Sequence, residues 1–145
     1  MQHVALQKII DKMELVNLTP EVSVDDIKVT KTDVNRIGMQ LTDFYDHFDN
    51  ERVQMIGHVE AAYMDTIDDD RKRDIYNKLM SSNIPCLIYC RNLKPDDIMI
   101  EAAVRNGVPI LSTNKTTSSF MAEIIRWLNV ELAPFISVHG VLVDV

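Results

Sequence analysis

Residues 84–111 decide the fold, and their sequence is IPCLIYCRNLKPDDIMIEAAVRNGVPIL. The run over residues 84–90 is almost entirely apolar, which is typical of a strand covered on both faces of a sheet. The proline and aspartate at positions 95–96 are residue types that open helices, and Gly107 is placed to close one. A second apolar run follows at 108–111. This order of strand, helix and strand predicts two parallel strands joined by a crossover helix.

The same alternation continues on both sides of this stretch. Three consecutive aspartates at 68–70 favour the start of a helix that ends near Ser82, because negative charge is stabilising at the positive end of the helix dipole. Residues 116–132 carry apolar side chains at intervals of three or four and predict a longer helix. Right-handed crossovers place helices on both faces of a parallel sheet. We therefore predict an α/β protein with three layers, α/β/α, around a largely parallel sheet.

The chain before residue 60 has weaker patterns. Apolar residues near helical spacing predict an amphipathic helix at the start of the chain, and alternating or β-branched segments predict short strands. The expected elements are a helix over 4–13, strands near 15–18, at 27–30 and at 52–57, and a short helix through Met39 and Leu41 that Thr32 and Asp33 could cap.

Composition limits the classes of partner. The 145 residues are 46% hydrophobic and 26% charged, which suits one globular domain with its own core. With 15 Lys and Arg against 22 Asp and Glu, the net charge is -7 and repels nucleic acid and anionic membranes. No apolar run approaches the roughly 20 residues of a membrane span, and the first residues are too charged for a signal peptide. We expect a cytoplasmic protein with no nucleic-acid or membrane partner.

The last residues have a different pattern. After Ala133 and Pro134, residues 135–145 are mostly β-branched and apolar, and their alternation predicts a single strand. The sequence stops at the last residue of this strand, without a terminal loop or a polar tail. We interpret this end as a cut within a longer chain rather than a natural stop, with residues 133–145 as a linker and a strand.

Several segments together carry a family resemblance. Residues 132–134 (LAP) followed by 138–145 (VHGVLVDV) resemble the start of the kinase domain in the HPr kinase/phosphorylase family. Segments that resemble the first domain of that family are 32–36 with 44–48, 84–88, and 108–111 followed by Thr117 and Ser118. Ile37 departs from the pattern, since we expect proline between Arg36 and Gly38. The resemblance covers most of the chain, and its specificity lies in the order of the segments.

The resemblance implies both a fold and a function. It implies a domain like the amino-terminal domain of the Mur ligases at residues 1–132, with a regulatory or assembly role. Residues 133–145 would then begin the kinase domain. The full-length bacterial enzyme is expected to use ATP or pyrophosphate with Mg²⁺ to phosphorylate a serine of the phosphocarrier HPr, and to reverse the reaction by phosphorolysis. It would act as a hexamer in carbon catabolite repression.

One catalytic residue follows from the resemblance. His139 matches the His-Gly pair that contributes a catalytic histidine in this family, and a histidine that titrates near neutrality can orient phosphate oxygens. Such phosphoryl transfer also requires a glycine-rich loop that ends in Gly-Lys-Ser or Gly-Lys-Thr, and no such loop occurs in this sequence. We therefore expect this chain alone to be inactive and to hold no cofactor.

A second candidate site comes from the residues themselves. The stretch 112–118 leads into a helix, where free amide groups and the side chains of Thr113, Lys115, Thr117 and Ser118 could hold an anion. An ordinary helix cap explains the same residues, because helix starts favour serine and threonine.

No metal site is expected. The aspartates at 65 and 68–70 cannot all converge on one ion. A zinc site at Cys86 and Cys90 is set aside because their separation on a strand is about 13 Å.

Two other classes of function remain open. One is a free-standing module that binds a phosphorylated metabolite or a nucleotide, which a Mur-like fold would allow by analogy. The other is a purely structural oligomerisation unit.

Overall fold

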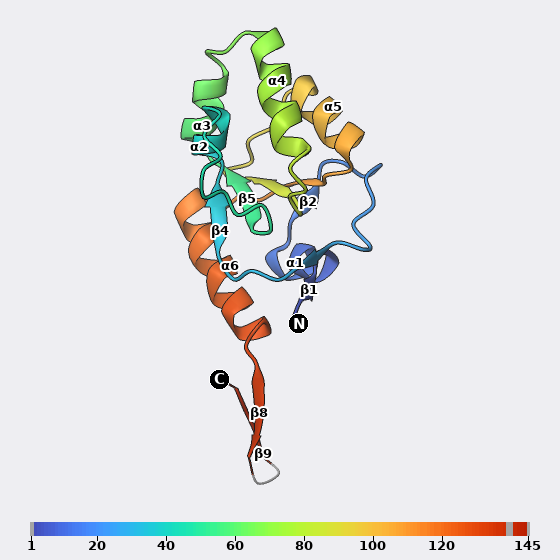
Figure 1. The fold of residues 1–145 in the computed structure, drawn as a ribbon, viewed down its shortest axis with the longest axis vertical. Coiled ribbons are helices and arrows are strands. Elements are labelled where there is room, and N and C mark those ends of the chain that lie inside the picture. The colour runs from blue at the N-terminus through green and yellow to red at the C-terminus, as the bar shows by residue number, and fades with distance from the viewer. Residues whose placement is uncertain (1, 139–140, 145) are drawn as a thin grey trace.

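The structure is a computed structural model that describes residues 2–138 and 141–144. Its centre is a five-stranded sheet with the order β2-β7-β6-β5-β4 (Figure 1). Four neighbouring strands are parallel: β4 (Val34–Arg36), β5 (Val53–Ile56), β6 (Leu87–Tyr89) and β7 (Ile110–Ser112). The edge strand β2 (Val16–Asn17) is antiparallel to β7. The predicted, largely parallel sheet is confirmed.

Six helices connect and cover the strands over the described residues. They are α1 (Leu6–Met13), α2 (Gly38–Leu41), α3 (His58–Met64), α4 (Asp69–Met80), α5 (Asp97–Asn106) and α6 (Thr117–Glu131). Two further antiparallel pairs lie outside the main sheet: β1 (Val4–Ala5) with β3 (Lys28–Val29), and β8 (Phe135–Val138) with β9 (Val141–Asp144).

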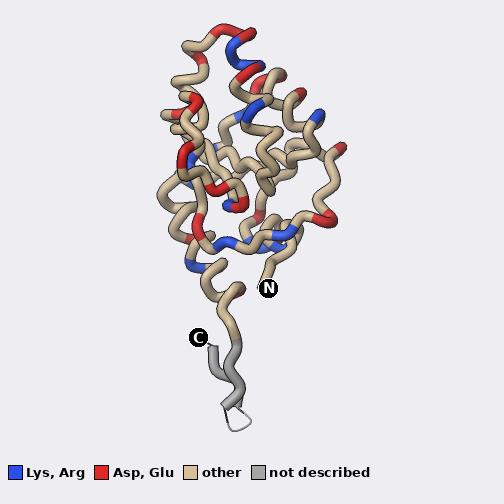
Figure 2. Tube along the Cα trace, in the orientation of Figure 1, with Lys and Arg blue, Asp and Glu red and all other residues tan. Residues whose placement is uncertain are grey.

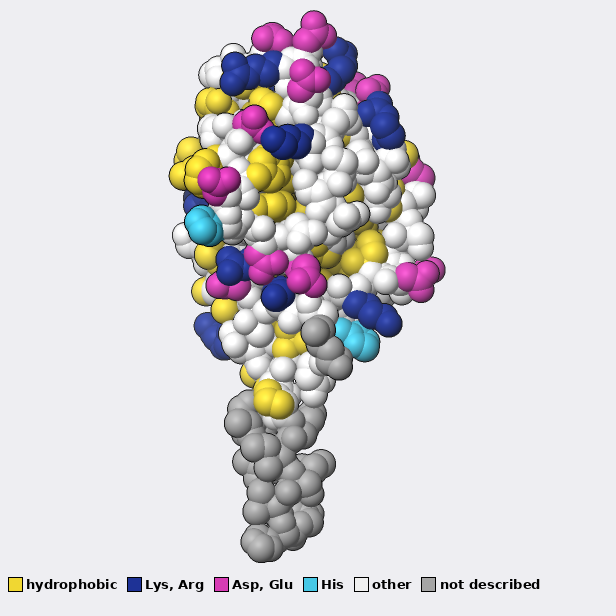
Figure 3. All heavy atoms as spheres, viewed as in Figure 1, with side chains coloured by type: hydrophobic (Ala, Val, Ile, Leu, Met, Phe, Trp, Pro, Cys, Tyr) yellow, Lys and Arg dark blue, Asp and Glu magenta, His cyan; other side chains and the backbone are white. Residues whose placement is uncertain are grey.

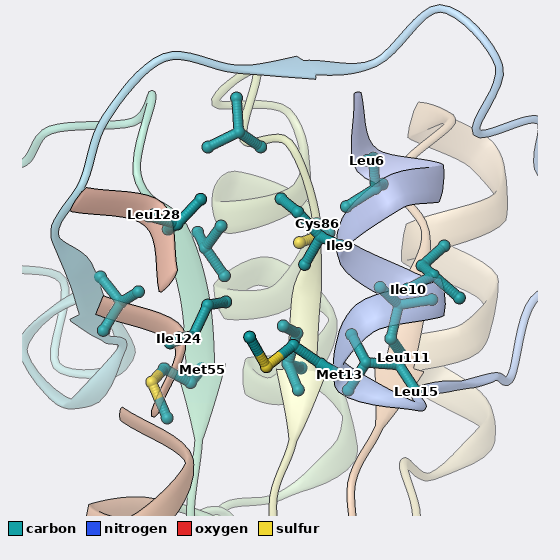
Figure 4. Packing of buried hydrophobic residues seen from close by; sticks show 14 of the residues in the cluster. Leu6, Ile9, Ile10, Met13, Leu15, Met55, Cys86, Leu111, Ile124 and Leu128 are labelled. Carbon is teal, nitrogen blue, oxygen red and sulfur yellow. The ribbon is translucent and has the colours of Figure 1, made fainter. Parts of the chain in front are cut away.

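Two hydrophobic cores lie on opposite faces of the sheet. One packs α1 and α6 against it, through residues such as Ile9 and Ile124 (Figure 4). The other packs α2 to α5 against the opposite face. The residues of β6 alternate between them, since Ile88 belongs to the first core while Leu87 and Tyr89 belong to the second. Because β6 is buried on both faces, its sequence is a continuous apolar run without alternating polar residues. The two cores on opposite faces confirm the three predicted layers.

The helix boundaries agree with local capping chemistry. The side chains of Asp68, Asp96 and Thr116 accept hydrogen bonds from amides in the first turns of α4, α5 and α6. Gly107 ends α5 with φ of 69°, in the left-handed region that glycine enters without a steric penalty. The helices predicted after residue 68 are therefore confirmed, and each begins directly after its capping residue.

The chain before residue 65 departs from expectation in several places. Thr32 and Asp33 do not cap a helix, because the next residues form β4, and the short helix α2 begins only at Gly38. The helix α3 was not predicted. β4 has only three residues and includes Asn35, which bonds the side chains of Gln40 and Gln54, so its sequence lacks an apolar strand pattern.

The single strand predicted over residues 135–145 is wrong. Two strands, β8 and β9, pair antiparallel instead, with Phe135 opposite Asp144 and Val138 opposite Val141. The alternation of β-branched residues is the same in one long strand and in two paired strands, so periodicity could not reveal the reversal.

Charged residues are spread over the coloured part of the chain in Figure 2. On the face drawn in Figure 3, Lys and Arg side chains are interspersed with Asp and Glu and form no broad basic surface. No helix within the described ranges has both the length and the apolar composition that crossing a membrane requires.

Candidate functional site

The parallel strands bring several polar residues to one edge of the sheet. β4 ends in Arg36, while Gly57 and Cys90 directly follow β5 and β6. The strand β7 leads through residues 113–116 into α6. In open α/β sheets, the carboxyl ends of the strands are the usual position of ligands. The carboxyl edge is therefore the place to look for a site.

Arg36 and Glu60 form the charged pair at this edge. The guanidinium donates two hydrogen bonds to the carboxylate, from Nε to Oε1 at 3.2 Å and from Nη2 to Oε2 at 2.7 Å. The amide of Gly57 donates a third, to Oε1 at 2.9 Å. The side chain of Glu60 is 8% exposed and that of Arg36 is 41% exposed. Within this pair, Glu60 is thus buried, whereas Arg36 is partly open to solvent.

The protonation of Glu60 follows from these contacts. Burial by itself raises the pKa of Glu60, but the hydrogen bonds from Arg36 and Gly57 and the charge of Arg36 outweigh it and hold the pKa below its ordinary value. Glu60 is therefore ionised at neutral pH, and its charge is compensated by Arg36.

Gly57 allows a close approach between this pair and α6. A Cβ atom at position 57 would lie 2.5 Å from Oγ1 of Thr117 and 3.2 Å from Nη2 of Arg36. Real Cβ atoms essentially never come within 3.0 Å of another heavy atom. The absence of a side chain at Gly57 therefore lets the start of α6 lie directly against the end of β5.

Thr117 is the unusual member of the group. It is only 6% exposed, and its hydroxyl oxygen is buried without a hydrogen-bond partner among the described residues. Its neighbour is the Cys90 thiol, whose pKa is raised by burial, but the two side chains do not meet in hydrogen-bond geometry. A buried hydroxyl without a partner is rare in folded proteins.

The predicted anion-binding residues are only partly brought together. Thr113 is buried, and its hydroxyl accepts a hydrogen bond from the Lys115 amide at 3.2 Å. The ammonium group of Lys115 pairs with Glu123, which compensates its charge. Ser118 is exposed at the start of α6, beside the buried Thr117. His139 lies outside the described residues.

The sequence reasoning missed Arg36, Gly57 and Glu60. Gly57 directly follows an apolar segment, and Glu60 comes three residues later. This spacing is the pattern of a strand that leads into a helix, in which the glutamate at the third helical position accepts a hydrogen bond from the amide of the residue before the helix. That signal could have found Gly57 and Glu60. Among the residues that the structure describes, no three or more His, Cys, Asp and Glu side chains are grouped so that they could hold a metal ion.

The architecture and the site define a class of protein, a three-layer α/β domain with a group of polar residues at the carboxyl edge of a largely parallel sheet. A family model described as "HPr Serine kinase N terminus" matches residues 4–128. The chain belongs to this family.

The relatives support the same assignment. A protein named HPr kinase/phosphorylase from Lachnoclostridium phytofermentans is 54% identical over 145 residues, which cover 100% of this chain and 47% of the relative. A protein of the same name from Caldicellulosiruptor bescii is 37% identical over the same shares of both chains. The chain thus spans about half the length of the curated relatives it matches.

A solved structure shares the fold. It is that of the CBS and DRTGG domains from the regulatory region of a Clostridium perfringens pyrophosphatase, in complex with diadenosine tetraphosphate. The TM-score is 0.54 at 17% identity, and the match covers 83% of this chain and 46% of the other. At this identity the likeness concerns the fold alone.

Proposed function

We propose that this chain is the amino-terminal, non-catalytic part of a bifunctional HPr serine kinase/phosphorylase. The full-length protein phosphorylates a serine of HPr with ATP or pyrophosphate and removes the phosphate by phosphorolysis. The observation that carries this proposal is the family match over residues 4–128, together with relatives of that name at 54% and 37% identity over the whole chain. The same match favours this function over that of a free-standing binding module.

The proposal divides the chain near residue 132. Residues 1–132 form the amino-terminal domain, and 133–145 connect it to the kinase domain and begin that domain. Two observations support this division: the family match stops at residue 128, and β8 and β9 pair with each other instead of joining the main sheet.

The chemistry is assigned to the remainder of the protein. Phosphoryl transfer depends on a loop whose backbone amides cradle the phosphates and on carboxylates that hold Mg²⁺. This sequence contains no Gly-Lys-Ser or Gly-Lys-Thr motif, which supports the inactivity of the chain alone. His139 would orient phosphate oxygens in the full-length enzyme only. The proposed cellular setting is a hexamer in the bacterial cytoplasm that takes part in carbon catabolite repression.

The test is phosphoryl transfer by the full-length gene product. With ATP or pyrophosphate and Mg²⁺, it should transfer phosphate to HPr but not to an HPr variant whose target serine is replaced by alanine. Adding inorganic phosphate should reverse the reaction. The chain 1–145 alone should transfer none, and His139→Ala in the full-length protein should greatly reduce transfer.

The encoded sequence gives an independent check. After Val145 we expect a short loop and then a glycine-rich motif ending in Gly-Lys-Ser or Gly-Lys-Thr within about two dozen residues. A full-length protein that lacks this motif, or that leaves HPr unmodified, would refute the proposal.

A further inference from the structure

We propose that the carboxyl edge of the sheet binds a phosphate group through the Thr117 hydroxyl, the first amides of α6 and the guanidinium of Arg36. This inference goes beyond the proposed function, which gives this part of the protein no ligand. It concerns a site at one end of the sheet, away from β8 and β9, and therefore does not depend on the kinase chemistry.

The first argument is the buried hydroxyl. Thr117 is 6% exposed, and its Oγ1 has no hydrogen-bond partner within the described chain. Thr19, at the opposite end of β7, is also fully buried, but its hydroxyl accepts a hydrogen bond from the Ile110 amide at 2.9 Å. Since burying a polar group without a partner is unfavourable, the Thr117 hydroxyl is expected to serve a group that comes from outside the chain.

The second argument is the helix that begins at Thr117. α6 has 15 residues, and its capping residue Thr116 bonds the amide of Ser119. The amides of Thr117 and Ser118 donate no hydrogen bond to any described residue. These two amides and the positive end of the helix dipole favour an anion at this position.

The third argument is the local charge. The loop after β6 is tied to the loop after β7, because Arg91 and Asn92 donate amide hydrogen bonds to the carbonyls of Lys115 and Thr113, each at 2.9 Å. This brings exposed Arg91, which makes no ion pair with described residues, beside the start of α6. Among the charged residues named here around the start of α6, three are cations (Arg36, Arg91, Lys115) and two are carboxylates (Glu60, Glu123), so this group is net positive in an acidic protein.

The fourth argument concerns the convergence of donors and the ligand type. Because Gly57 has no side chain, Thr117 and Arg36 both approach it closely: a Cβ atom there would lie 2.5 Å from Oγ1 of Thr117 and 3.2 Å from Nη2 of Arg36. Arg36 is 41% exposed and bonds Glu60 only through Nε and Nη2, so its remaining N–H groups can bond a ligand while the ion pair is kept. The free groups are amides, a guanidinium and a hydroxyl, all of which donate. Their complement is a ligand rich in acceptors, as a phosphate group is.

A titration of this chain with inorganic phosphate tests the proposal. The melting temperature should rise saturably, by roughly 3–6 °C at ten times the dissociation constant. Thr117→Val removes the hydroxyl and keeps the shape, so it should weaken phosphate binding at least tenfold. Thr117→Ser restores a hydroxyl and should restore binding. Thr19→Val is the matched control at the other end of β7 and should leave the phosphate-induced rise intact.

A second arm of the experiment distinguishes the source of the phosphate. Glycerol phosphate that binds more tightly than inorganic phosphate identifies a phosphorylated metabolite, whereas equal or weaker binding identifies free phosphate. A melting temperature that does not rise saturably, or a rise that Thr117→Val leaves unchanged, overturns the proposal. Neither result bears on phosphoryl transfer to HPr by the full-length protein, so the two proposals fail separately.

Discussion

The two ends of strand β7 bury two threonines in opposite states. At the amino end, Thr19 is 0% exposed and its hydroxyl is bonded to the amide of Ile110. Beyond the carboxyl end, Thr117 is 6% exposed and its hydroxyl has no partner in the described chain. The difference indicates that the amino edge of the sheet is built for stability, while the carboxyl edge keeps hydrogen-bond donors free for a ligand.

The largest expected effect is at Gly57. Gly57→Ala places a Cβ atom 2.5 Å from Oγ1 of Thr117, and we expect the free energy of unfolding to fall by about 2 kcal/mol, as for other overpacked sites. Chemical denaturation measures this change. Gly38→Ala is the control, because the nearest atom to its Cβ would be 3.8 Å away, and it should have little effect.

A double-mutant cycle sharpens the Gly57 prediction. Thr117→Ala removes Oγ1, so Gly57→Ala should be less destabilising in that background than in the original chain. Equal costs in both backgrounds would contradict the close approach of α6 to the end of β5.

The next effect is at the amino edge. Thr19→Val removes the acceptor of the buried Ile110 amide, and the free energy of unfolding should fall by about 1–2 kcal/mol, because that amide loses its partner. Denaturant unfolding at neutral pH measures it. A variant as stable as the original chain would show that Thr19 contributes packing only.

The charged pair at the carboxyl edge predicts a pH dependence. Because the pKa of Glu60 is lower in the folded state, its contribution to stability is present above its ordinary pKa of 4.5 and is lost as the pH falls through the folded-state value. Glu60→Gln should therefore be less stable than the original chain at pH 7, and the difference should shrink below about pH 4.5. Parallel denaturation curves at several pH values measure this. A difference that does not change with pH would contradict the role assigned to the ion pair.

The smallest effect is at Thr117. Thr117→Val replaces a buried hydroxyl that has no partner, so without phosphate the free energy of unfolding should stay within about 0.5 kcal/mol or rise slightly. The contrast with Thr19→Val is the test, because the two substitutions are chemically the same. An equally large loss at both positions would mean that the Thr117 hydroxyl has a partner in the folded protein.

The sequence predicted the centre of the fold better than its carboxyl edge. Residues 84–111 follow local rules, since an apolar run buried on both faces and the capping residues Asp96 and Gly107 lie within one short stretch. Thr117 was also a candidate, because a helix start can be recognised locally. Its contact with Gly57 joins residues far apart in the chain and depends on how α6 packs, which no local pattern contains.

The omission of Arg36 and the unforeseen pairing of Lys115 also have specific physical causes. Arg36 was missed as a site residue because β4 is too short for a strand pattern to reveal where it ends. The role of Lys115 as an anion ligand stays a prediction, and its pairing with Glu123, which crosses from a loop onto α6, could not be inferred from spacing. The predicted roles of Thr113, Ser118 and His139 stay predictions.

Amide chemical shifts during a phosphate titration test the central claim most directly. We predict that the amide resonances of Thr117 and Ser118 shift saturably, while the amides of Ile110 and Met99 stay in place because Thr19 and Asp96 already bond them. Shifts at Thr117 and Ser118 that are absent, or no larger than those at Met99, would contradict the account.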